Sequence, residues 1–277
     1  MSAASPAPTG PLPHETGPVH HRVHVLSLAG KPGEPVTLPE AFSTPVRPDL
    51  VRRAVVAAQS HRIQPHGTAP TAGARHSVEW SGKGKGVART PRLMDSMRGA
   101  QAPNTVGGRP AHPPRVATLW GKKINVQERR LAFVSALAAT REAKLASARG
   151  HAVPEKLPLP VVVENPLEEV TTTAEAQKVL THLKLWHEVE RARDKVQHRS
   201  GRARRRGRGR RVPSGLLIVT SAPGKARGFR NLPGVDVVPT GRLGTEDLAP
   251  GGEPGRLALF TPASLQALAL RLGGGAR

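Results

Sequence analysis

The residues of this chain that could do chemistry are mainly cations interleaved with glycines. One group runs from Gly82 to Gly86 as Gly-Lys-Gly-Lys-Gly, and Arg89 and Arg92 follow it closely. Glycine lets a backbone approach a phosphate, and an adjacent Lys or Arg neutralises the phosphate charge. This spacing therefore predicts contact with phosphate groups.

The same group is not typical of a mononucleotide site. A Walker loop needs Gly-Lys-Ser/Thr between a strand and a helix, whereas no Ser or Thr follows these lysines and we expect no strand before them. The glycines also miss the spacing of a dinucleotide-binding loop. The remaining alternative is a flexible, solvated loop without a partner, and its length and charge count against that interpretation.

A second cationic group lies between residues 198 and 212, where arginines alternate with glycines and no acid intervenes. Guanidinium groups bind phosphates through two parallel hydrogen bonds, and such a run cannot bury itself against protein. A nuclear-targeting or merely solubilising tract is the alternative. The position just before a strongly predicted strand favours a loop beside the folded domain, where it can contact RNA. Its arginines are Arg199, Arg202, Arg204, Arg205, Arg206, Arg208, Arg210 and Arg211.

The sequence lacks the patterns of catalytic and metal sites. It contains no Gly-x-Ser-x-Gly elbow. Glu168 and Glu169 are adjacent without forming a recognisable site, and Glu188 and Glu190 are interpreted as ordinary ion-pair partners of nearby basic residues. There are 12 histidines but no cysteine and no His-Glu-x-x-His pattern, so the histidines, among them the isolated His151, are interpreted as polar contacts. We predict no catalytic residue, no metal and no cofactor.

The composition of the chain also predicts a partner that carries phosphate groups. The chain has 42 Lys and Arg against 20 Asp and Glu, a formal charge of +22, which suits a protein that neutralises phosphates. A membrane surface would require an amphipathic basic helix or a lipid anchor, and neither is evident. Tyrosine is absent and aromatic residues make up 3%, so base stacking cannot be the main binding mode. The lack of cysteine is compatible with a reducing, cytoplasmic location.

Hydrophobic periodicity predicts an α/β fold, a single globular domain with a mostly parallel sheet flanked by helices. A turn is expected at residues 31–34, and the stripe Leu131, Val134, Ser135, Leu137 and Ala138 is expected to be buried. The expected strands are residues 22–28, 159–164, 215–221, 235–238 and 257–260. A helix of about 20 residues is expected between caps at Asn125 and Gly150. The other expected helices are residues 48–63, 173–185 and 262–272.

The domain is expected to span residues 22–277 after a disordered tail at residues 1–21. Two segments interrupt it. Residues 64–123 form a long extended loop of about 60 residues with only two acids, Glu79 and Asp95, and residues 198–212 form the arginine-rich loop. A structureless connection of that length is either disordered or functional.

Several stretches resemble the L-four family of large-subunit ribosomal proteins, in its archaeal–eukaryotic branch. They occur in consistent order, and together with the intervening sequence the resemblance spans roughly residues 23–272. The stretches are residues 44–50 (TPVRPDL), 54–62 (AVVAAQSHR), 107–114 (GGRPAHPP), 128–140 (ERRLAFVSALAAT), 231–237 (NLPGVDV) and 246–252 (EDLAPGG).

This resemblance implies a structural constituent of the ribosome that binds large-subunit ribosomal RNA and supports subunit assembly. It implies a long internal loop that helps form the polypeptide exit tunnel beside neighbouring ribosomal proteins, in a cytoplasmic ribosome. The tip nearest the tunnel would comprise Trp80, Gly82, Lys83, Gly84, Lys85 and Gly86. The RNA-contacting residues would be the eight arginines of the second segment together with Arg75, Lys83, Lys85, Arg89, Arg92, Arg98, Arg109, His112, Arg115, Lys122 and Lys123.

Two other functions stay open at this point. A regulator that binds messenger RNA and represses translation would use the same cationic segments. A nuclease or RNA-modifying enzyme is a further alternative, and the absence of an acidic cluster for metal ions counts against it.

Overall fold

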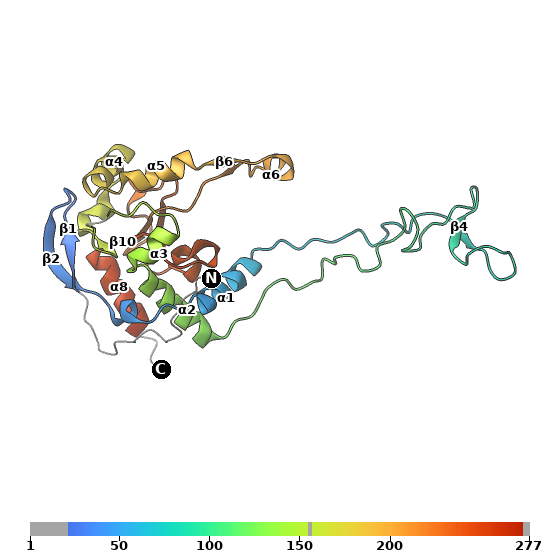
Figure 1. Cartoon of the computed structure of the whole chain (residues 1–277), viewed down its shortest axis with the longest axis horizontal. Helices are drawn as coiled ribbons and strands as arrows, with labels where there is room; N and C mark the ends of the chain where they lie inside the picture. Colours follow the sequence, from blue (N-terminus) through green and yellow to red (C-terminus); the bar gives the residue numbers. More distant parts are fainter. Residues whose placement is uncertain (1–21, 155–156, 274–277) are drawn as a thin grey trace, which may run out of the picture. The chain divides into compact units, whose positions relative to one another are not determined.

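The computed structural model describes residues 22–154 and 157–273 (Figure 1), so the tail predicted at residues 1–21 lies outside the described residues. Contacts divide the chain into two compact units, residues 1–56 with 124–277 and residues 57–123. We call the first the globular unit and the second the long arm.

A four-stranded sheet forms the centre of the globular unit. Its order is β5 (Val161–Val162), β10 (Ala258–Phe260), β8 (Leu217–Thr220) and β9 (Asp236–Pro239), and every neighbouring pair is parallel. The fold class predicted from the sequence, α/β with a mostly parallel sheet flanked by helices, is confirmed.

Both faces of the sheet are covered, which explains why its strands are uniformly apolar. Alternate residues of β8 and of the position before it enter two different cores: Leu217 and Val219 belong to one hydrophobic cluster, whereas Leu216 and Ile218 belong to the other. The first cluster includes side chains of α1 (Pro48–Ser60), α2 (Val126–Ala139) and α8 (Pro262–Gly273). The second includes side chains of α4 (Thr173–His182) and α5 (Trp186–Asp194).

An antiparallel hairpin of β1 (Arg22–Leu26) and β2 (Pro32–Thr37) lies beside the sheet. A parallel bridge from Leu26 to Val163 connects it to the β5 edge. The turn predicted at residues 31–34 is wrong, because the chain turns earlier, where Gly30 takes φ +78° and its N–H bonds to Ser27 O. Two prolines in β2 weaken its strand signal, yet they are tolerated in an edge strand.

The long helix predicted between Asn125 and Gly150 is two helices. Asn125 caps α2 as expected, accepting the Gln127 N–H at 2.9 Å. The helix ends at Ala139, the hydroxyl of the following Thr140 bonds back to Leu137 O at 2.7 Å, and α3 (Ala143–Ala148) follows after a break. Leu131, predicted to be buried, is 52% exposed, while Ala132 is fully buried in its place.

The remaining elements are short. Helix α5 was not predicted, since its sequence WHEVERARD is dominated by charge; α4 ends at His182, three residues before its predicted end. The 3-10 helices are η1 (Glu40–Ser43), η2 (Asn165–Glu169), η3 (Arg227–Phe229) and η4 (Pro250–Gly252), and one further helical turn is α7 (Thr245–Leu248).

A buried carboxylate joins the carboxyl ends of two parallel strands. Glu168 in η2 accepts the Ser221 N–H at 2.7 Å and the Ser221 and Thr261 hydroxyls at 2.6 and 2.7 Å. Ser221 follows β8 and Thr261 follows β10. Ligands often bind at this edge in open α/β sheets, but here these bonds of Glu168 go to the protein itself, which makes it a structural link.

The long arm ends in a hairpin that the sequence did not predict. Strands β3 (Val78–Trp80) and β4 (Pro91–Leu93) pair antiparallel, and the Gly-Lys group lies between them (Figure 1). The expectation that no strand precedes this group is therefore wrong: three-residue strands are too short to show periodicity. No helix follows the glycines before β4, so the arrangement still differs from a Walker loop.

The arginine-rich segment is likewise a hairpin rather than a plain loop. Strands β6 (Gln197–His198) and β7 (Arg210–Arg211) pair antiparallel, and the short helix α6 (Gly201–Arg205) lies between them. In Figure 1 this hairpin continues from the end of α5. We call residues 197–211 the second arm.

Candidate nucleic-acid interface

The tip of the long arm combines exposed lysines with glycines in an unusual backbone conformation. Gly82, Gly84 and Gly86 have φ of +65°, +78° and +64°, and a Cβ added at any of them would meet no atom within 4 Å. These glycines are thus required by the backbone and not by packing. Backbone in which left-handed residues alternate with ordinary ones forms concave groups of N–H donors that bind anions. The exposed Lys83 and Lys85 add charge beside them.

Behind the tip, the outgoing and returning limbs of the long arm keep an antiparallel register. As residue numbers rise along the outgoing limb, the residues paired with them on the returning limb have falling numbers. The Lys122 N–H bonds to Ser60 Oγ at 2.8 Å, and the Thr68 N–H bonds to Pro114 O at 3.1 Å. Further out, the Gln101 amide donates to Ala74 O at 3.3 Å. These contacts hold two chains that have almost no regular secondary structure in a defined pairing.

Two glycines of the long arm lie in close backbone contacts, Gly73 between the two limbs and Gly108 within the returning limb. A Cβ at Gly73 would lie 2.5 Å from Arg109 N, and a Cβ at Gly108 would lie 1.9 Å from Ala102 O. Backbone atoms cannot yield at such distances, so no larger residue fits without moving a limb. The segment at residues 107–114 thus has a packing role in addition to its charge.

The predicted RNA-contacting residues of the long arm are exposed, with one exception. Arg92 is half-buried and donates to Met97 O at 2.8 Å and Ala88 O at 3.3 Å, so it stabilises the hairpin. Arg75 also contacts Thr71 Oγ1, at 3.1 Å. The exposed residues are Arg75, Lys83, Lys85, Arg89, Arg98, Arg109, His112, Arg115, Lys122 and Lys123.

Apolar side chains lie at the hairpin, where Trp80 was predicted as a tip residue but Met94 and Met97 were not. Trp80, Met94 and Met97 are 66%, 70% and 57% exposed and line a small pocket of about 50 Å³. A second tryptophan, Trp120, stacks on His66 with 4.9 Å between ring centroids. Few as the aromatic residues are, the long arm carries two of the three tryptophans.

The second arm presents its arginines to solvent. Arg210 and Arg211 pair with His198 and Gln197 across the hairpin, and among the described residues none of its eight arginines forms an ion pair. Cations without an internal partner are available to an external anion. The exposed arginines are Arg199, Arg202, Arg204, Arg205, Arg206, Arg208, Arg210 and Arg211.

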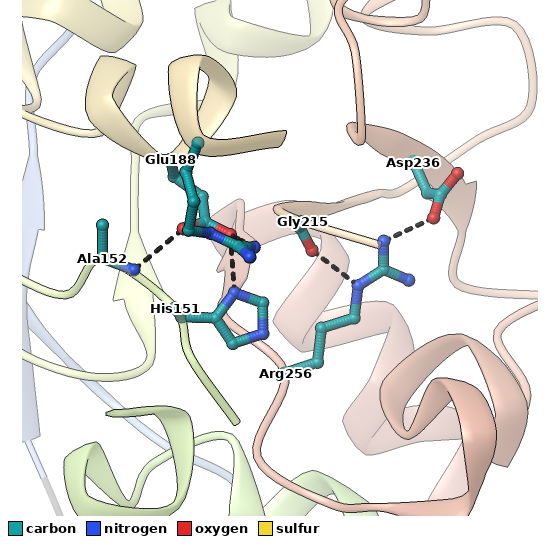
Figure 2. Close-up of polar contacts among 7 residues, drawn as sticks. His151, Ala152, Glu188, Gly215, Asp236 and Arg256 are labelled. Atoms are coloured by element: carbon teal, nitrogen blue, oxygen red, sulfur yellow. Dashed lines mark hydrogen bonds and ion pairs between the residues drawn. The ribbon is translucent and has the colours of Figure 1, made fainter. Parts of the chain in front are cut away.

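Glu188 of α5 is the centre of a buried polar cluster (Figure 2) that was not predicted from the sequence. Glu188 accepts from the Ala152 N–H at 2.9 Å and from Arg191 through two bonds of 2.9 and 2.5 Å, and lies 2.6 Å from His151 Nδ1. Burial by itself raises the pKa of Glu188, but the hydrogen bonds from His151 and Arg191 outweigh it and hold the pKa at about 2. Glu188 is therefore an ionised anion that pairs with a nearby basic residue, Arg191, as expected, but it does so in a buried position.

A second buried group in Figure 2 is the Arg256 guanidinium. Its Nε donates to Gly215 O at 2.8 Å, one terminal nitrogen donates to Asp247 O at 2.7 Å, and the other pairs with Asp236. The i, i+3 spacing of Glu188 and Arg191 was readable from the sequence. The contacts of His151 and Arg256 join residues far apart in the chain and were not.

Neither a metal-binding group nor a membrane span is found in the described parts of the chain. In residues 22–154 and 157–273, no three His, Asp or Glu side chains are grouped to hold a metal ion. No helix within these ranges is long and apolar enough to cross a membrane.

Comparison with known proteins gives one consistent result. The sequence profile of the ribosomal protein L4/L1 family matches residues 36–271. Large ribosomal subunit protein uL4 of Methanosphaera stadtmanae is 42% identical over 248 residues, which cover 89% of this chain and 96% of that protein. The proteins of the same name from Methanopyrus kandleri and Pyrobaculum aerophilum are each 44% identical, over 90% and 93% of this chain and 98% and 92% of their own length.

Proposed function

We propose, because the chain belongs to the ribosomal protein L4/L1 family, that its two arms bind large-subunit ribosomal RNA and hold the RNA fold in place. Members of this family are structural components of the large ribosomal subunit and not enzymes. The observation that carries the proposal is the placement of 18 predicted RNA-contacting cations and His112 on two hairpin arms, all but Arg92 exposed.

The arms would bind mainly through charge and shape. Exposed Lys and Arg neutralise backbone phosphates, and this part of the affinity does not depend on sequence. The arms bury little apolar surface of their own, so part of their ordering entropy would be offset only when RNA packs around them. A protein that binds in this way would stabilise assembled RNA and assist subunit assembly.

The long arm has the reach to enter an RNA core. Twenty extended residues span at most about 70 Å, and each limb between the globular unit and β3 or β4 has about that many residues or more. The family resemblance supports placing the tip, residues 80–92, at the wall of the polypeptide exit tunnel beside other ribosomal proteins. The exposed Trp80, Met94 and Met97 would suit such a protein neighbour. In this proposal the protein works in cytoplasmic ribosomes.

Sedimentation of a cell extract tests the ribosomal role. We expect the chain to travel with the large subunit and to remain there at moderate salt, because many phosphate contacts act together. A chain in which the second-arm arginines and the tip lysines are replaced by Gln should shift to lighter fractions. Recovery of the unaltered chain only in soluble fractions would contradict the proposal.

Deletion of residues 81–92 tests the role of the tip. We expect the melting curve of the globular unit, followed by circular dichroism, to be unchanged, because the tip belongs to the other compact unit. Large subunits that carry the shortened chain should have a wider tunnel by electron cryomicroscopy. Loss of the whole fold would contradict the independence of the arm, and an unaltered tunnel would contradict the placement of the tip.

A further inference from the structure

The globular unit contains a cationic pocket of about 460 Å³ at the root of the second arm. Its charged lining consists of four cations and one acid, which are Arg149, Arg191, Lys195, Arg211 and Glu253. Three of these cations, Arg149, Arg191 and Lys195, were not among the residues predicted from the sequence. We call this site the Arg149 pocket.

Arg149 is held in the pocket by neutral partners. It follows α3, and its two terminal nitrogens donate to the main-chain carbonyls of Glu253 and of Pro250, the latter at 2.6 Å. Carbonyl groups fix the guanidinium but do not cancel its charge. Among the described residues, no carboxylate forms an ion pair with Arg149, and Glu253, the one acid of the pocket lining, attracts it only from beyond ion-pair distance.

Three further cations line the pocket together with Arg149. Arg191 is oriented by the buried Glu188, which uses two of the five N–H donors of the guanidinium. The pKa of Arg149 is lowered by burial and further by the positive charges of Arg256 and Arg191, although the charge of Glu253 acts in the opposite direction. Lys195 and Arg211 are exposed at the mouth, and neither has an ion-pair partner in the described parts of the chain. An anion in the pocket would relieve this repulsion.

We propose that the Arg149 pocket binds phosphate groups of an RNA backbone at the point where the RNA passes from the second arm onto the globular unit. The proposal rests on the proposed function and adds a site on the folded domain to the two arms. Arg211 connects the second arm with the pocket, because it lines the pocket and is also the last residue of the arm, in β7. The exposed arginines of the arm and the pocket thus form one cationic track.

The lining favours a backbone phosphate over a free nucleotide. In the described structure no aromatic side chain lines the pocket, so a base would have nothing to stack on. Fixed guanidinium groups and a mobile lysine suit phosphate oxygens. Inorganic pyrophosphate shares this chemistry, and it therefore serves as the probe that separates a free anion from a polynucleotide.

The test replaces the two exposed cations at the mouth, since their removal leaves the buried contacts of Arg149 and Arg191 intact. The variant is Lys195→Ala with Arg211→Ala in the full chain. The matched control is Lys178→Ala with Arg242→Ala, which removes the same charge from exposed positions outside the pocket. Affinity for a large-subunit ribosomal RNA fragment is measured across a salt series, and pyrophosphate binding is measured by calorimetry. Equal melting temperatures of the variant, the control and the unaltered chain would show that the substitutions leave the fold intact.

We expect the pocket variant to bind RNA roughly tenfold more weakly than the control, with its slope of log affinity against log salt reduced by about 1.4 to 1.8 for two lost phosphate contacts. If variant and control bind RNA equally while the unaltered chain binds tightly, the pocket proposal fails and the proposed function stands. Loss of pyrophosphate binding without loss of RNA affinity would make the site one for a free anion and overturn the proposal. If the unaltered chain binds no ribosomal RNA, both proposals fail.

Discussion

At the scale of single residues, the informative groups are buried charges rather than the exposed cations. Glu188 is 1% exposed, yet it keeps its charge because every neighbour that reaches it donates a hydrogen bond. A buried charge deprived of its partners is strongly destabilising. Glu188 also orients Arg191, which lines the Arg149 pocket, so its role in stability and its role in the pocket are linked.

Glu188→Gln should lower the free energy of unfolding at pH 7 by on the order of 3 kcal/mol, because it leaves Arg191 without its counter-charge. Urea unfolding followed by circular dichroism measures this. The matched control is Glu190→Gln, which removes an exposed pairing with His187 and should change the unfolding free energy by less than about 1 kcal/mol. Equal losses in the two variants would contradict the assigned role of Glu188.

The same carboxylate predicts a pH dependence. Its pKa is about 2 in the folded chain against an ordinary value of 4.5, so its contribution is complete above pH 4.5 and is lost as the pH falls toward 2. The stability difference between the unaltered chain and Glu188→Gln should therefore shrink by roughly half between pH 7 and pH 3. A difference that stays constant over this range would contradict an ionised Glu188.

At the scale of elements, the long arm is ordered by pairing and close approach and not by a core. Its limbs are held by contacts such as Ser60 with Lys122 and Thr68 with Pro114. Its glycines fall into two kinds. Gly73 permits backbone contact between the limbs, whereas the tip glycines supply left-handed conformations in open space. The first kind sets the pairing of the limbs, and the second shapes the tip.

Gly108→Ala should loosen the long arm without destabilising the globular unit, because the added Cβ would lie 1.9 Å from Ala102 O in the arm alone. Hydrogen exchange should accelerate in residues 57–123, while the melting temperature of the globular unit stays unchanged. Gly241→Ala is the control, since a Cβ there meets nothing within 4 Å. Unchanged exchange in residues 57–123 would show that the arm does not need this contact.

At the scale of the whole molecule, the residues that form the folded core and the residues that carry the positive charge of the arms lie in different parts of the sequence. The sheet and its two cores use residues with almost no charge, while the long arm has eleven Lys and Arg against two acids and the second arm has eight arginines and no acid. Removing charge from an arm should therefore alter binding much more than stability.

Replacing Arg204, Arg205, Arg206 and Arg208 by Gln should leave the unfolding free energy within about 0.5 kcal/mol of the original, as is usual for surface substitutions. The affinity for ribosomal RNA should fall, and its salt slope should decrease by about 3 for four lost contacts. Filter binding across a salt series measures both. An unchanged slope would mean that these arginines do not contact phosphate.

Much of the element order could be predicted from the sequence. Uniformly apolar runs such as residues 215–221 identified the buried strands, since both faces of the sheet are covered. Periodicity identified α1, α4 and α8, and the Asn125 cap was correct. The errors fell where short-range signals are weak. They include the proline-containing β2, the break before α3 and the three-residue strands of the long arm.

By itself, the sequence determined the fold class and the cationic character of the two arms, because composition and periodicity are local properties, and the order of its motifs indicated the family. The tertiary structure decided what depends on residues far apart in the chain. It brought Arg149, Arg191 and Arg211 around one pocket, paired His151 with Glu188 and set the limbs of the long arm in register. It also placed the Gly-Lys-Gly-Lys-Gly group between two paired strands. The physical reason is that contacts between distant residues are fixed by folding and not by spacing along the chain.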